Sequence, residues 1–452
     1  MRLRLALLLC RVSRFFLRLL GRGGTTVPGR IALAVYPSLL QVLAEEVTTV
    51  VVTGTNGKTT SVRMIEQGLQ LAGMSHFTNR SGANLIAGIT AEYVDYATWG
   101  GKPRKKYAVI ECDEEALARV CHLVNPRVIL LTNLFKDQLG RFASVYHTRA
   151  MIAAGIQLSP SSTICLNGDD FLSASLARGL TQEVVYYGMG ETACRSSSSA
   201  TQEENPLCLY CHTPLSYYRR SYAHLGAFYC SGCGFFRPAL DVAIAEAQLA
   251  ESSSLVSLRL ADSTISTRVN LPGAYNLYNA VGASAVMQAL ALPPQIIAEA
   301  LATFQGGFGR MERFQLEGVP VQMILVKNPA GFNQVISYLA DHVPEGLAVI
   351  CLNNQDADGT DISWIDEVNF APLKENFPQI WLAGSCAEEV AKRLELHGIS
   401  RQLLTIYTDY RELLQQLLAQ QLPVYILPSY SAMMDLREVI SRRFGLKRYW
   451  ES

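Results

Sequence analysis

A glycine loop followed by a lysine and two threonines is the clearest chemical motif in this sequence. It reads Gly54-Thr55-Asn56-Gly57-Lys58-Thr59-Thr60, with two residues between its glycines where the common phosphate loop has four. Backbone N–H groups of such a loop converge on phosphate oxygens. The motif therefore predicts a nucleotide site in which Lys58 neutralises the β/γ-phosphates and the Thr59 hydroxyl binds Mg²⁺.

Three carboxylates lie at the carboxyl end of a second apolar run. Glu111 ends the run 107–111, and Asp113 and Glu114 come directly after it. Mg²⁺ prefers one or two carboxylates together with phosphate and water. The carboxyl ends of strands face the ligand crevice in a doubly wound sheet. Glu111 is therefore the predicted metal ligand, and a solvated acidic turn is the alternative interpretation of these residues.

Two Cys-x-x-Cys pairs form a separate motif. Cys208 and Cys211 are followed, after eighteen residues, by Cys230 and Cys233. This spacing is typical of a tetrahedral zinc site with four thiolates. Four protein ligands leave no open position for water, so the predicted role of the metal is structural.

The elements that must position these motifs belong to an α/β fold. The glycine loop lies between a β-branched run and a segment with helical spacing, as a phosphate loop requires. Further apolar runs alternate with helical stretches, which indicates a mostly parallel, doubly wound sheet. The expected strands are 48–52, 107–111, 127–132 and 162–166.

A composition change and a second alternation divide the chain into domains. The cysteine- and tyrosine-rich residues 191–240 interrupt the first alternation, and a second one begins near residue 321. The expected domains are a basic amphipathic segment at 1–45, a central ATP-binding domain at 46–313 with a zinc-ribbon insertion at 201–238, and a Rossmann-like α/β domain at 314–452.

Composition and charge exclude several classes of protein. The 452 residues carry 39 basic and 39 acidic side chains, whereas a general nucleic-acid binder needs a clear basic excess. No apolar run reaches the roughly 18–20 residues that span a bilayer. Eleven cysteines, an odd number in a long chain without a credible export signal, favour reduced thiols in the cytoplasm.

The amino-terminal segment predicts a basic amphipathic helix, and its first acidic residue is Glu45. Apolar residues recur at helical spacing, namely Leu5, Leu8, Val12, Phe15, Phe16 and Leu19. Another stripe carries arginines, namely Arg11, Arg14, Arg18 and Arg22. Such a helix can make peripheral contact with an anionic membrane surface or pack on its own protein, and the sequence leaves both open.

Four segments together resemble the Mur ligases, the ATP-dependent amide-forming enzymes of peptidoglycan synthesis. They are the glycine loop, Gly273-x-x-Asn276-x-x-Asn279-Ala280, Gly309-Arg310-Met311-Glu312 and Thr132-Asn133-Leu134-x-x-Asp137. The resemblance implies that Asn279 lies on the adenine side of ATP and that Arg310 binds ATP near the domain junction. Gln138 stands where those ligases have histidine, and the sequence has no counterpart of their amino-terminal domain for the uridine nucleotide substrate.

A narrower resemblance is to the MurT family, the synthetase subunits of lipid II isoglutaminyl synthase. It depends on the zinc ribbon, the missing domain and the segments 327–333 and 358–364. It implies a cytoplasmic heterodimer at the inner face of the membrane, with a GatD-like glutaminase that releases ammonia. This subunit would use ATP and Mg²⁺ to activate the α-carboxylate of D-glutamate in lipid II as an acyl phosphate, which ammonia converts to D-isoglutamine.

The same resemblance gives Asp361 a catalytic role. Its carboxylate would complete, across the subunit interface, a triad whose cysteine and histidine belong to the glutaminase. Asp358 is interpreted as an ordinary turn residue with an Asx cap. Two alternative functions stay open: a Mur-type ligase that adds an amino acid or peptide without a glutaminase, and a zinc-ribbon scaffold that binds nucleotide as a structural or regulatory ligand.

Overall fold

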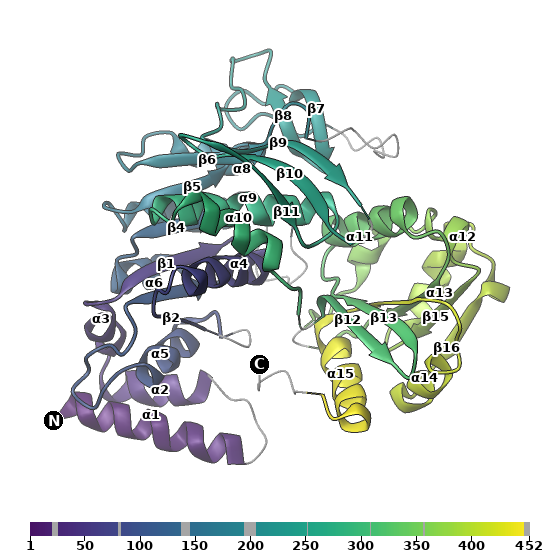
Figure 1. Cartoon of the computed structure of the whole chain (residues 1–452), viewed down its shortest axis with the longest axis horizontal. Helices are drawn as coiled ribbons and strands as arrows, with labels where there is room; N and C mark the ends of the chain where they lie inside the picture. The colour runs from purple at the N-terminus through teal and green to yellow at the C-terminus, as the bar shows by residue number, and fades with distance from the viewer. Residues whose placement is uncertain are drawn as a thin grey trace.

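Two sheets, one in each half of the chain, organise the protein (Figure 1). The computed structural model describes residues 1–19, 26–79, 83–136, 145–193, 205–250, 252–307, 309–355 and 358–446. The predictions that involve Arg22, Asp137, Gln138 and the first residues of the zinc-ribbon insertion, 201–204, lie outside the described residues.

The first sheet has nine strands within these ranges, in the order β11-β10-β9-β6-β5-β4-β1-β3-β2. The seven strands from β9 to β2 are parallel neighbours, while β10 and β11 extend the edge antiparallel. The strands are β1 (Thr48–Thr53), β2 (His76–Thr78), β3 (Tyr107–Glu111), β4 (Val128–Leu131), β5 (Thr163–Asn167), β6 (Val184–Met189), β9 (Val242–Leu249), β10 (Ser254–Arg259) and β11 (Thr264–Val269). The predicted parallel sheet and its four expected strands are confirmed.

Helices cover both faces of the first sheet, as a sheet with apolar runs requires. Along β1, Val50 and Val52 face a cluster that includes α4 (Lys58–Leu71), α9 (Ala274–Ala289) and α10 (Pro294–Thr303). Val51 faces the opposite cluster. That side holds α1 (Arg2–Leu19), α2 (Thr26–Val35), α3 (Leu39–Ala44), α5 (Ile86–Asp95), α6 (Leu117–Val124), α7 (Val145–Gln157) and α8 (Phe171–Ala174), with a short 3₁₀ turn at Ser175–Ala177.

The second sheet has six strands within the described residues, in the order β12-β13-β17-β14-β15-β16, and only β12 runs antiparallel to its neighbour. Its elements are β12 (Arg310–Leu316), β13 (Val319–Ile324), α11 (Pro329–His342), β14 (Leu347–Cys351), α12 (Leu373–Asn376), β15 (Gln379–Ala383), α13 (Ala387–Leu396), β16 (Leu404–Tyr407), α14 (Tyr410–Leu417), β17 (Val424–Pro428) and α15 (Tyr430–Phe444). The expected boundary between residues 313 and 314 therefore falls inside β12, the first strand of this sheet.

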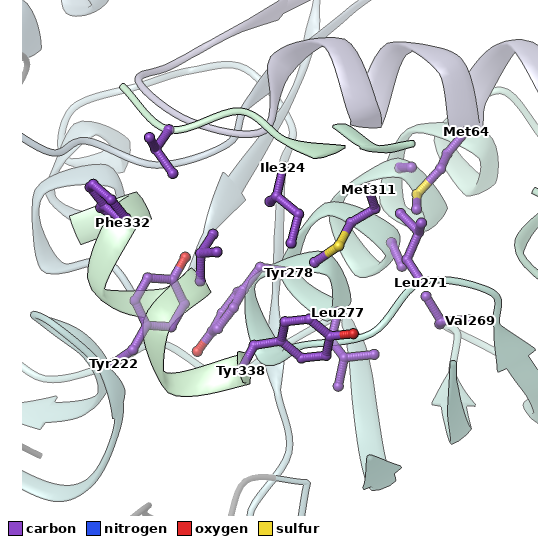
Figure 2. Close-up of a cluster of buried hydrophobic side chains, with 14 of the residues drawn as sticks. Met64, Tyr222, Val269, Leu271, Leu277, Tyr278, Met311, Ile324, Phe332 and Tyr338 are labelled. Atoms are coloured by element: carbon purple, nitrogen blue, oxygen red, sulfur yellow. The ribbon is translucent and has the colours of Figure 1, made fainter. Parts of the chain in front are cut away.

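A shared hydrophobic cluster joins the two halves. Met64 and Leu271 come from the first half, while Met311 and Ile324 come from the first two strands of the second sheet (Figure 2). All four are buried, at 0% to 6% exposure. A continuous core across the junction fixes the two sheets relative to each other, and the polar groups above it form the candidate site.

The amino-terminal helix α1 packs on its own protein through the side that carries Ala6, Leu7, Cys10 and Arg14. The Arg14 guanidinium lies 2.6 Å from Glu92 and 2.8 Å from Asp95, both on α5. Arg11 donates to the carbonyls of Val94 and Ala97, at the carboxyl end of the same helix. Cationic side chains stabilise such an end, where carbonyls lack helical partners. Packing of α1 on the protein is thus observed. Of the arginine stripe, Arg11 and Arg14 bind the protein, whereas Arg18 is exposed.

Candidate functional site

The glycine loop connects β1 to α4 and can adopt its path only with glycine at two positions. Gly54 has φ 118° and Gly57, the residue before α4, has φ 85°. A Cβ at Gly54 would lie 2.4 Å from Thr132 Oγ1, and one at Gly57 would lie 1.9 Å from Asn279 Oδ1. The loop therefore brings backbone N–H groups and the first turn of α4 to the edge of the sheet without side chains in the way.

The segment after β4 holds this loop in place. Asn133 accepts a hydrogen bond from the Asn56 backbone N–H at 2.9 Å and donates to the Asn56 carbonyl at 3.1 Å. The Thr55 hydroxyl accepts from the Phe135 backbone N–H at 3.0 Å and donates to the Phe135 carbonyl at 3.2 Å. Thr132-Asn133-Leu134, noted in the sequence only for its resemblance to the Mur ligases, thus acts as the support of the loop.

Lys58 is buried among acidic groups at the start of α4. Its Nζ lies 2.9 Å from Glu114 Oε1 and donates to the Gly54 carbonyl at 2.5 Å. Burial opposes the charged form, but the carboxylates of Glu114, Glu111 and Asp113 raise the pKa of Lys58 above its usual value. The ammonium group is therefore protonated near neutral pH, as a phosphate-binding lysine must be.

The predicted magnesium ligands lie side by side. The Thr59 hydroxyl donates to Glu111 Oε2 at 2.5 Å. Two neighbouring ligands of an octahedral Mg²⁺, each about 2.1 Å from the metal, lie about 3 Å apart, so this pair can accept the ion with a small shift. Burial and the nearby Glu114 raise the pKa of the third acid, Asp113. These hard oxygen donors fit Mg²⁺, and Glu114 is a partner of Lys58 rather than a residue of a solvated turn.

A cleft between the two halves of the chain is lined by the three acids and by the predicted nucleotide residues other than Gly54 and Thr59. Asn279 on α9 and Arg310 at the start of β12 both line it, as do Asn56, Gly57, Lys58 and Thr60. Its apolar part is formed by side chains from both halves: Leu271, Tyr275, Phe304, Met311, Ile324 and Val335. A polar end rich in N–H groups and an apolar end match the triphosphate and the base of a nucleotide.

Two cleft residues of the second half were not predicted as site residues. Lys327 follows β13 and lines the cleft near Asp113. Burial raises the pKa of Asp113, and the positive charge of Lys327 partly offsets that effect. The Asn328 side chain donates to Asn56 Oδ1 of the glycine loop at 2.8 Å and accepts from the Gly331 backbone N–H as the cap of α11. The available signal was the motif at 327–333, but nothing in its sequence indicates a partner 272 residues away.

Asp361 lies apart from this cleft. None of the described residues that line the cleft comes from the segment 358–367. Asp361 is exposed, and its carboxylate accepts from the Ser363 backbone N–H at 2.8 Å, just before the 3₁₀ turn Ser363–Glu367. That hydrogen bond lowers the pKa of Asp361 below its usual value.

The interpretation of Asp358 as a local Asx cap is wrong. Its carboxylate accepts instead from the backbone N–H and the hydroxyl of Ser431, in the first turn of α15. An anionic group stabilises the amino end of a helix, so Asp358 anchors this loop on a helix 73 residues further along the chain. The Asx turn belongs to Asp361.

The four paired cysteines converge at one end of a small hairpin. Strands β7 (Ser216–Tyr222) and β8 (Leu225–Tyr229) pair antiparallel between the two Cys-x-x-Cys turns. The four sulfur atoms all lie within 4.8 Å of one another. Thiolates around a tetrahedral zinc ion, at about 2.3 Å from the metal, lie about 3.8 Å apart. Hydrogen bonds from Thr213 lower the pKa of Cys211 to about 6, which favours its thiolate form. Against a hydrogen bond from the Phe235 backbone, desolvation and the neighbouring sulfur atoms raise the pKa of Cys233 to about 12.

Replacing Cys230 with serine tests the structural role of this cluster. We expect about one zinc ion per chain in the unchanged protein, and zinc loss with a several-fold lower soluble yield for Cys230→Ser. His212, beside the cluster but outside it, provides the control, since asparagine tolerates its φ of 58°. His212→Asn should keep its zinc. A soluble, stable Cys230→Ser variant that lost only turnover would contradict a structural role.

Two family models match the chain. The Mur ligase middle domain matches residues 52–215, and the MurT ligase C-terminal model matches residues 325–433. The first covers the glycine loop and the acids, and the second covers Lys327, Asn328 and Asp361. Together with the two sheets, these matches confirm the predicted Mur ligase-type fold.

Curated relatives match over nearly their whole length. The MurT subunit of the glutamine-hydrolysing lipid II isoglutaminyl synthase from Streptococcus pneumoniae strain R6 is 34% identical over 443 residues, 97% of each chain. Its counterpart from Staphylococcus aureus strain COL is 32% identical over 441 residues, 97% of this chain and 98% of that one. Among solved structures, the MurF ligase from Thermotoga maritima in complex with ADP shares the fold, with a TM-score of 0.63 and 15% identity over 91% of this chain and 84% of that one.

Proposed function

Because the chain belongs to the MurT family of Mur ligases, we propose that it is the synthetase subunit that amidates the α-carboxylate of D-glutamate in the stem peptide of lipid II. It is an ATP-dependent ligase of peptidoglycan synthesis. The observation that carries the proposal is the cleft, in which a phosphate loop, three acids and a lysine of the second half face one another.

The reaction needs a leaving group on a carboxylate, which is a poor electrophile. One carboxylate oxygen attacks the γ-phosphorus of ATP and ADP leaves, so that an acyl phosphate forms. Ammonia then attacks the acyl carbon, phosphate leaves, and a proton is lost from nitrogen to give the amide. Charge moves between oxygens in the first step, so fixed cations beside the phosphates lower its barrier.

The residues of the cleft suit these tasks. Lys58 supplies a positive charge, because its acidic neighbours keep its ammonium group protonated. The N–H groups of the loop would bind phosphate oxygens. Bound Mg²⁺, held by Thr59 and Glu111, would polarise the phosphoryl oxygens. Asn279 and Arg310 would bind the nucleotide from α9 and β12, on opposite sides of the domain junction.

We assign the four-cysteine cluster to a structural zinc ion and the source of ammonia to a partner subunit. The curated relatives are named as subunits of a glutamine-hydrolysing enzyme, which supports a complex. We propose a GatD-like glutaminase as the second chain of a heterodimer, with Asp361 completing its catalytic triad. The substrate carries a lipid, so the complex would work in the cytoplasm at the inner face of the membrane.

Mass spectrometry of lipid II tests this function. The chain, purified together with a candidate cytosolic glutaminase, is incubated with lipid II, ATP and glutamine. We expect the stem peptide to become lighter by about one mass unit, since OH is replaced by NH₂. Phosphate release that depends on an amino acid or peptide, and not on ammonia, would instead favour the Mur-type ligase, and unaltered lipid II with no ATP turnover would favour the scaffold.

A further inference from the structure

The amino-terminal helix α1 exposes an apolar face to solvent. The side chains on it are 41% to 72% exposed, with Phe15 at 64% and Phe16 at 55%. The two phenyl rings contact each other edge to face, with centroids 5.8 Å apart. The α1 apolar face consists of Leu5, Leu8, Val12, Phe15, Phe16 and Leu19. A contiguous exposed apolar surface of this kind marks an interaction site.

The orientation of α1 is fixed from its other side. Ala6, Leu7, Cys10 and Arg14 are buried against the domain. The Arg14 guanidinium sits between Glu92 and Asp95 with only 9% of its side chain exposed, and turning the helix over would leave Glu92 buried without its partner. Breaking a buried ion pair in this way is strongly destabilising. The outward direction of the apolar face is therefore part of the fold.

Arginines border the α1 apolar face on both edges. At 100° per residue, Arg4 and Arg18 lie along one edge of the face and Arg2 lies along the other. All three are exposed. The first 44 residues contain seven arginines and no acidic residue. The surface around the face is thus complementary in charge to an anionic partner.

A neighbouring loop extends this basic surface. The Arg11 guanidinium lies 4.5 Å from the centre of the Trp99 ring, which is 52% exposed. A Cβ at Gly101 would lie 3.0 Å from Leu3, so the loop touches α1 directly. The exposed Lys102 and Arg104 follow on the same loop. Exposed tryptophan and basic side chains together are typical of a protein surface at a membrane interface.

We propose that α1 lies flat in the headgroup layer of an anionic phospholipid bilayer, with its apolar face among the acyl chains and the exposed Arg2, Arg4 and Arg18 on the lipid phosphates. No helix in the described ranges is long and apolar enough to cross a membrane, so the contact is peripheral. A bilayer fits this face better than a protein does, because the face is apolar along the whole helix and its charges are of one sign. Figure 1 shows α1 along the outer edge of the first domain, remote from the second sheet.

Flotation with phospholipid vesicles tests the proposal without substrate, so its outcome is independent of the proposed amidation. The full chain is mixed with vesicles of equal parts phosphatidylglycerol and phosphatidylcholine, or of phosphatidylcholine alone. We expect binding to the anionic vesicles. The double variant Phe15→Ser/Phe16→Ser should bind them at least ~10-fold more weakly, since each buried phenyl group contributes strongly to transfer from water. Arg2→Gln/Arg4→Gln should weaken binding to the anionic vesicles by roughly tenfold and leave any binding to phosphatidylcholine vesicles unchanged.

A matched control variant replaces two exposed apolar side chains that lie outside α1. Tyr218 and Leu396 are 81% and 75% exposed, on the zinc-ribbon hairpin and on α13. Tyr218→Ser/Leu396→Ser should bind vesicles as the unchanged protein does, within about twofold, and all variants should keep its thermal unfolding midpoint. Equal losses in Phe15→Ser/Phe16→Ser and Tyr218→Ser/Leu396→Ser, or no binding by the unchanged protein, would overturn the proposal. A dimer in solution that Phe15→Ser/Phe16→Ser converts to monomer, without vesicle binding, would assign the face to a second copy instead.

Discussion

Lys58→Ala is expected to reduce ATP-driven amidation by roughly 10³-fold or more, the loss typical of removing a fixed charge that stabilises a transition state. Lys58 is the buried cation of the glycine loop, and the three acids around it keep it protonated. Alanine cannot neutralise phosphate, and it leaves Glu114 without its partner at 2.9 Å. The measurement is amide formation on lipid II with glutamine as nitrogen source, together with glutamine hydrolysis by the same complex.

The loss of an ion pair must be separated from the loss of phosphate binding. Removing one member of a buried pair can cost about 3–5 kcal/mol of stability, so Lys58→Ala alone could act through unfolding. Lys58→Ala/Glu114→Gln removes both charges and should recover most of the thermal stability without recovering amidation. Glutamine hydrolysis should survive in both variants unless the two sites are coupled. Full amidation by a folded Lys58→Ala variant would show that this turn does not bind phosphate.

The sequence was sufficient where function depends on neighbours along the chain. The glycine loop could be recognised because a strand, two glycines at left-handed positions and a helix are adjacent in sequence, and each constrains the backbone locally. The same holds for the cysteine pairs, in which each turn supplies two of the four sulfur atoms that converge. Four of the seven parallel strands described in the first sheet could be predicted, because strands buried on both faces are continuous apolar runs.

Contacts between distant segments escaped prediction for a physical reason. The pattern of α1 distinguishes an apolar side from an arginine side, but the distant carboxylates Glu92 and Asp95, which pair with Arg14, help to decide which side packs inward. The link between Asn56 and Asn328 joins residues in different halves of the chain. Strands β10 and β11 were missed because only alternate residues of each face the core, so neither forms an apolar run.

Asp361→Asn is expected to lower glutamine hydrolysis by about 10²–10⁴-fold while complex formation and ATP binding persist, since a triad carboxylate orients the imidazole and stabilises its charged form. The structure gives the carboxylate the properties that such a role requires. It is exposed, lies outside the cleft of the glycine loop, and accepts a hydrogen bond from the Ser363 N–H that lowers its pKa. Asparagine keeps the size and the acceptor for Ser363 but removes the charge.

The choice of nitrogen source distinguishes a role of Asp361 in the partner's active site from a role in the synthetase site of this chain. Free ammonium at elevated pH supplies ammonia without a glutaminase, so it should restore amidation in Asp361→Asn. Asp366→Asn is the matched control: Asp366 is an exposed acid of the adjacent 3₁₀ turn, and its surface ion pair with Arg393 contributes little to stability. It should leave both activities unchanged. If glutamine and ammonium fail equally in Asp361→Asn, then Asp361 serves the synthetase reaction or the fold, because a defect confined to ammonia production cannot persist when ammonia is supplied.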